Sequence, residues 1–112
     1  MNTIKSLTCF FIFVLVLTPL GTAQTTSGSI AGSVIDQQQA AITNATVTVA
    51  DETKGFSLSA TTDKEGRFVF PQLPPGTYTL SVDAKGFKKL QRAGIALVAN
   101  DKLALGDLPT SV

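Results

Sequence analysis

The sequence contains no histidine and no tryptophan, and it has a single cysteine, Cys9, near the N-terminus. Without histidine, neither a Ser-His-Asp nor a Cys-His nucleophilic centre can be assembled, and the usual zinc ligand sets are missing. One thiol cannot form an intramolecular disulfide bond. These absences predict a protein that is not an enzyme, has no metal site and no cofactor, and depends on packing for its stability.

An excess of charge of one sign is also missing. Nine Lys and Arg residues are balanced by eight Asp and Glu residues, which gives a net charge of +1. Nucleic acids and anionic membrane surfaces attract strongly basic proteins. The balanced composition therefore argues against a nucleic-acid partner.

The N-terminal segment has the pattern of a secretory signal peptide. Lys5 supplies a positive charge, an apolar run covers residues 7–17, and Pro19 ends the run ahead of small residues at 21–23. Such a run is too short to span a bilayer, because a spanning helix takes roughly 20 residues. We expect a cleaved signal, with an uncleaved anchor as the alternative.

Cleavage after Ala23 would divide the chain into a signal peptide, a polar linker, one domain and a tail, at residues 1–23, 24–28, 29–108 and 109–112. The cleaved product would have no membrane span. It would be exported and would reside in the periplasm, at the outer membrane or outside the cell.

After the linker, the chain consists of short segments in which apolar and polar residues alternate, separated by turn residues. This period of two is typical of strands with one buried face, and no segment shows a sustained helical period. The expected buried positions include Ile30, Val34, Val47, Val49, Phe56, Leu58, Phe68, Phe70, Tyr78, Leu80, Val82, Ile95 and Leu97. We expect an all-β fold, an antiparallel β-sandwich of about seven strands in two sheets.

Two turns carry specific expectations. Residues 63–66 are expected to form a hairpin turn in which Gly66 adopts the left-handed conformation. This segment faintly matches a calcium-binding loop, but it lacks the later acidic ligands, so the turn is the favoured interpretation. At residues 73–76, Pro75 and Gly76 predict a type II turn with a positive φ at the glycine. The acidic pair Asp51-Glu52 is expected to be solvated.

Several motifs together resemble the carboxypeptidase regulatory-like domain family. They are Gly32-Ser33-Val34-Ile35-Asp36, the segment 41–49, Gly66-Arg67-Phe68, Leu73-Pro74-Pro75-Gly76-Thr77-Tyr78 and Lys85-Gly86-Phe87. The resemblance implies a transthyretin-like β-sandwich, grouped with carbohydrate-binding-like folds. It also implies the kind of domain found at the N-terminus of TonB-dependent outer-membrane receptors. Those receptors continue for hundreds of residues, so we expect either a free-standing domain or a truncated N-terminal domain.

The expected function is therefore that of a non-catalytic interaction or support module of the cell envelope. Its partner would be an envelope protein or the other domains of a parent receptor. The alternative is a carbohydrate-binding module with an oligosaccharide ligand. Sugar platforms use exposed aromatic rings, whereas Tyr78 shares the register of Leu80 and Val82, which favours a core position.

Binding is expected at loop ends or at a free sheet edge, to which a partner strand can be added. The candidate contact residues lie in three loops: Asp36, Gln37 and Gln38; Asp63, Lys64 and Glu65; and Lys85, Phe87 and Lys88.

Overall fold

The computed structural model describes residues 26–112 of the chain. The expected signal peptide and the first two linker residues lie outside this range. The described residues form seven strands: β1 (Gly28–Ile35), β2 (Thr46–Asp51), β3 (Phe56–Thr61), β4 (Arg67–Leu73), β5 (Gly76–Asp83), β6 (Leu90–Leu97) and β7 (Lys102–Pro109). No helix capable of crossing a membrane occurs in residues 26–112.

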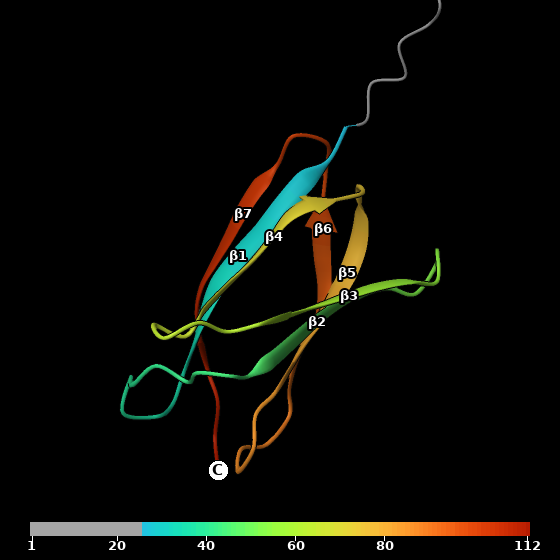
Figure 1. Cartoon of the computed structure of the whole chain (residues 1–112). Coiled ribbons are helices and arrows are strands. Elements are labelled where there is room, and N and C mark those ends of the chain that lie inside the picture. Colours follow the sequence, from blue (N-terminus) through green and yellow to red (C-terminus); the bar gives the residue numbers. More distant parts are fainter. Residues whose placement is uncertain (1–25) are drawn as a thin grey trace, which may run out of the picture.

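The strands form the two-sheet sandwich that the alternating pattern predicts (Figure 1). One sheet has the strand order β4-β1-β7 and the other has the order β3-β2-β5-β6. Apolar side chains at alternate positions of the strands point between the sheets, where their burial removes them from water and drives folding. The core consists of Ile30, Val34, Ile42, Ala45, Val47, Val49, Phe68, Phe70, Leu73, Tyr78, Leu80, Val82, Ala84, Ile95, Leu97 and Leu108.

The prediction that every strand pair is antiparallel is wrong for one pair. β7 lies parallel to β1, with Ser29 opposite Lys102 and Ile35 opposite Pro109. A parallel pair needs a long connection, and here nearly the whole domain separates the two strands. Local turn signals contain no information on such a pairing, so the alternation predicts the strand but not its neighbour.

The segment 63–66 is a turn, but the strands that it joins do not form a hairpin. β3 belongs to the four-stranded sheet and β4 to the three-stranded sheet, so this turn carries the chain from one layer to the other. The hairpin of this region is instead formed by β2 and β3, which pair without interruption from Thr46 opposite Thr61 to Asp51 opposite Phe56.

Candidate functional site

The loop that follows β1 is held in a compact turn by its own aspartate. Asp36 Oδ1 accepts hydrogen bonds from the backbone N–H groups of Gln38 and Ala40, at 2.8 and 2.9 Å. An aspartate that satisfies nearby N–H groups replaces a backbone turn and is favoured for that reason. The side chains of Gln37 and Gln38 remain exposed.

The loop between β3 and β4 repeats this design. Asp63 Oδ1 accepts hydrogen bonds from the N–H groups of Glu65 and Arg67, each at 2.9 Å. Gly66 adopts the predicted left-handed conformation, with φ of +73°. Its carbonyl accepts a hydrogen bond from Val34 N–H at 2.7 Å. Asp63 therefore shapes a turn, and residues 26–112 contain no group of three or more His, Cys, Asp or Glu side chains that could hold a metal ion.

The loop between β5 and β6 presents basic side chains on an apolar support. Phe87 N–H donates to the carbonyl of Ala84 at 3.0 Å, and Gly86 between them has φ of +88°. Lys85 and Lys88 are exposed, whereas Phe87 is half-buried and packs against the core. The aromatic ring thus anchors the loop, and the lysines face the solvent.

These three loops lie at the same end of the sandwich, where the C-terminal segment joins them (Figure 1). Thr110 donates both its N–H and its hydroxyl to the carbonyl of Ile35, at 2.8 and 2.9 Å, next to the Asp36 loop. Lys88 N–H donates to the carbonyl of Ser111 at 2.7 Å. The structure therefore brings together the candidate residues that the sequence places in separate loops.

Two buried threonines support this end, and no sequence pattern predicts their role. Thr62 Oγ1 donates to the Ile42 carbonyl at 2.7 Å and accepts from Ala45 N–H at 2.9 Å. Thr62 and Thr110 are only 4% and 3% exposed. Threonine is frequent along the strands of this chain, so neither residue stands out before its hydrogen-bond partners are known.

At the other end of the strands, the expectation of a solvated Asp51 is wrong. Asp51 is 1% exposed and its Oδ1 accepts hydrogen bonds from the hydroxyl and the N–H of Thr53, at 2.6 and 3.1 Å. Its Oδ2 has no protein hydrogen-bond partner and lies against Gly76, where a Cβ would be 2.3 Å away. Buried carboxylates are normally paired, which makes this oxygen an exception.

The same contact corrects the expectation for Gly76. Gly76 does not have the positive φ of a type II turn. In residues 26–112, the glycines with positive φ are Gly55, Gly66, Gly86, Gly94 and Gly106. Glycine at position 76 instead provides room for the Asp51 carboxylate. The requirement is therefore a close approach between two segments and not a backbone conformation.

Electrostatics at this end link the two segments further. The hydrogen bond from the Thr53 side chain lowers the pKa of Asp51, against the opposing effect of burial, and the Lys54 ammonium group helps to lower it. Lys54 Nζ donates to the Pro75 carbonyl at 2.6 Å. Burial, aided by the charge of Asp51, raises the pKa of Tyr78, whose hydroxyl donates to the Pro74 carbonyl. These contacts are structural and attach the β2–β3 turn to the β4–β5 turn.

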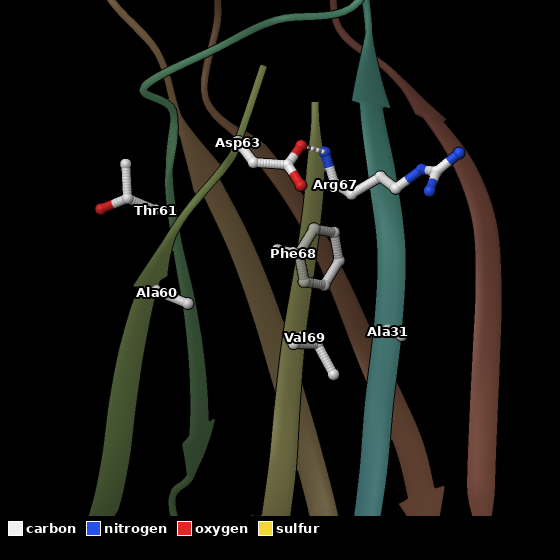
Figure 2. Close-up of a pocket in the computed structure, with 7 residues that line it drawn as sticks. All are labelled: Ala31, Ala60, Thr61, Asp63, Arg67, Phe68 and Val69. Atoms are coloured by element: carbon white, nitrogen blue, oxygen red, sulfur yellow. Dashed lines mark hydrogen bonds between the residues drawn. The ribbon is translucent and has the colours of Figure 1, made fainter. Parts of the chain in front are cut away.

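A groove of about 470 Å³ lies between the edges of the two sheets, next to the Asp63 turn (Figure 2). Figure 2 shows the β3 residues Ala60 and Thr61 on one side and the β4 residues Phe68 and Val69 on the other. The remaining lining residues are Ala31, Asp63 and Arg67. The polar side-chain groups of this lining are the Asp63 carboxylate, the Arg67 guanidinium and the Thr61 hydroxyl.

The fold and its loop cluster define a β-sandwich domain whose exposed features are turns and sheet edges. The chain belongs to the carboxypeptidase regulatory-like domain family, whose sequence model matches residues 29–108. A curated relative is the TonB-dependent transporter Oar of Myxococcus xanthus, which is 36% identical over 75 residues. The match covers 66% of this chain but only 7% of the transporter.

Solved structures with low sequence identity share the fold. A candidate carbohydrate-binding protein of Bacteroides uniformis superimposes with a TM-score of 0.59 at 15% identity, covering 74% of this chain and 40% of that chain. The 3-chlorocatechol 1,2-dioxygenase of Rhodococcus opacus gives 0.59 at 12% identity, covering 82% and 62%. A fold shared by such different proteins identifies an architecture and not an activity.

Proposed function

We propose that this protein is an exported, non-catalytic interaction module of the cell envelope, which binds a protein partner through the loop end of the sandwich. The observation that carries the proposal is the convergence of the loops at 36–41, 63–66 and 85–89. Thr110 and Ser111 form hydrogen bonds with Ile35 and Lys88, and Gly66 forms one with Val34. Loops held on a rigid scaffold are the usual place for binding residues. The relationship to a TonB-dependent transporter supports a location in the envelope.

The charges of the loop end suggest how a partner would be recognised. Lys85 and Lys88 are exposed on one loop, and Asp63 and Glu65 are exposed on another. A surface with both signs of charge fits a protein surface of complementary pattern, which fixes orientation and accelerates encounter. Parent receptor domains or a separate envelope protein would both meet this description.

Site-specific photo-crosslinking in intact cells tests the proposal. A crosslinker at Lys88 should yield one discrete adduct, and the same group at exposed Ala96 on β6 should not. With the crosslinker at position 88, Lys85→Glu should reduce the adduct strongly, because it reverses a charge that a partner would meet. Equal adducts at both positions, or none at either, would contradict a binding surface at the loop end.

Carbohydrate binding is the second candidate, since a candidate carbohydrate-binding protein shares the fold. The structure supports it less well, because Tyr78 is 1% exposed and packs edge-on against Phe56 in the core. Titration with a panel of oligosaccharides would detect this activity through saturable binding. Binding that the Lys85→Glu and Lys88→Glu substitutions leave unchanged would assign it to another surface.

A further inference from the structure

Each of the two open sheets ends in two edge strands, and three of these four edges carry features that oppose pairing with another strand. β6 contains Arg92 and a register shift beside Gly94, whose φ is +74°. β7 contains a register shift beside Gly106, whose φ is +73°, and ends at Pro109. β4 contains Pro71, which cannot donate a backbone hydrogen bond. Bulges, charges and prolines are the devices by which proteins block exposed edges.

β3 has none of these devices. Its sequence, Phe56–Thr61, contains no charged residue, no proline and no glycine. It pairs with β2 over six consecutive residues without a register shift, so its free edge is straight and regular. Ser57, Leu58 and Ser59 are all exposed. The groove beside Ala60 and Thr61 separates this end of the strand from β4, which leaves the edge open (Figure 2).

The inward face of β3 is also incompletely covered. Phe56, Leu58 and Ala60 lie opposite Asp51, Val49 and Val47 of β2 and therefore share the face that points toward the core. Yet Leu58 is 42% exposed while Val49 beside it is fully buried. The three-stranded sheet does not extend far enough to cover this strand. An additional strand at the β3 edge would shield apolar surface as well as pair backbone groups.

We propose that two copies of this protein associate through their β3 strands, antiparallel and edge to edge, to form one continuous eight-stranded sheet. A second copy is favoured because the edge is complementary to itself. With Leu58 on the twofold axis, Leu58 meets its counterpart, Phe56 meets the partner's Ala60, and Ser57 meets the partner's Ser59. Apolar residues thus face apolar ones and hydroxyls face hydroxyls, as stable cross-strand pairs require.

Charge permits this arrangement as well. The six residues of β3 contribute no like-charge repulsion, and the whole chain carries a net charge of only +1. Antiparallel pairing also brings the start of β3, which lies just after Lys54, near the end of β3 in the second copy, which lies just before Asp63. A single edge of this length is small by the standards of stable dimers, so the association is weak and depends on protein concentration.

Sedimentation velocity of the purified protein over a range of concentrations tests the inference. The wild-type protein should shift toward dimer as concentration rises. Leu58→Lys should weaken this association by about tenfold or more, because it places two like charges across the axis. Val98→Lys is the matched control, since Val98 is also an exposed apolar residue, at 60% exposure, but lies between β6 and β7, outside the groove beside β3, and it should associate like the wild type.

Two further measurements make the test independent of the stability of one variant. A mixture of Leu58→Lys and Leu58→Glu proteins should form heterodimers although each variant alone remains monomeric. In the protein that begins at Gln24 and so lacks Cys9, Leu58→Cys should form a disulfide-linked dimer under mild oxidation, and Val98→Cys should not. A wild-type protein that stays monomeric at every concentration, or equal crosslinking at both positions, would overturn the proposal.

Discussion

Asp51 shows how much a single residue depends on partners that are distant in the sequence. Next to Glu52 it reads as part of a solvated pair, but its carboxylate is buried between Thr53 and Gly76. Gly76 is the first residue of β5 and lies 25 positions later in the sequence. Burial of a charge normally requires compensation, and here Thr53 supplies it at one oxygen only. No local pattern reveals this contact, because either residue is ordinary in its own segment.

The pKa of Asp51 leads to a prediction about pH. This pKa lies below its ordinary value of 3.8 in the folded protein, so the ionised carboxylate contributes stability that is fully present above that value. The contribution is lost as the pH falls through the lower, folded pKa. Urea unfolding of wild type and Asp51→Asn should therefore differ most near neutral pH, and the gap should narrow below about pH 4. A gap that does not change with pH would contradict a stabilising charge.

The contact between Asp51 and Gly76 leads to a second prediction. Gly76→Ala should destabilise the protein by about 1–3 kcal/mol, because the added Cβ overlaps Asp51 Oδ2. The cost should be much smaller in an Asp51→Ala background, where the clashing oxygen is gone. A double-mutant cycle of thermal or urea unfolding measures this coupling. Additive effects would show that Gly76 is needed for another reason.

At the scale of strands, the alternation of apolar and polar residues predicts the elements well and their neighbours poorly. The inward positions of β1, β2, β4 and β5 are buried as expected, because a period of two fixes the face of each side chain. The pattern predicts a buried Leu58 as well, and that is wrong, since the opposite sheet ends before β3. The alternation also does not predict the parallel pairing of β7 with β1, because the two strands meet only when the whole domain has folded.

The turn residues illustrate the same limit for the candidate site. Asp36 and Asp63 predict turns correctly, since an aspartate can accept hydrogen bonds from the residues that follow it. That these turns share one end of the molecule depends on the antiparallel pairing of β1 with β4, in which Ser33 lies opposite Arg67 and Val34 N–H donates to the Gly66 carbonyl. The composition of each loop was therefore predictable, whereas the assembled surface was not.

β4 allows a prediction that compares neighbouring residues on opposite faces. Phe68→Ala should destabilise the protein by about 3–5 kcal/mol, because its ring is 4% exposed and packs edge-on against Phe70. Val69→Ala, at 55% exposure on the same strand, should change the free energy of unfolding by less than about 0.5 kcal/mol. Chemical denaturation of both variants measures the difference. Similar losses in the two variants would contradict the assignment of the inward face.

At the scale of the whole molecule, the fold contains two kinds of exposed surface with different consequences. The loop end is polar and carries both signs of charge, which suits recognition of a different protein. The β3 edge is uncharged and regular, which suits pairing with an identical strand. The two surfaces involve separate residues, and a dimer joined at β3 would leave the loops at 36–41 and 85–89 of both copies available, although the turn at 63–66 follows directly on β3. Such a dimer would offer two equivalent binding sites to the protein that the loop end recognises. Two linked sites increase avidity without any new contact.

The proposed role in the cell envelope requires that the protein is exported, and export can be tested at the expected cleavage site. A signal peptidase reads small residues at the first and third positions before the cut, which here are Ala23 and Gly21. The exported product should therefore begin at Gln24, as N-terminal sequencing and the intact mass would show. Ala23→Leu should retain a longer, membrane-bound precursor, whereas Thr22→Leu, at the position between, should be processed normally. A product that keeps Met1 and remains in the cytosolic fraction would contradict export, and with it the envelope as the place where the loop end meets its partner.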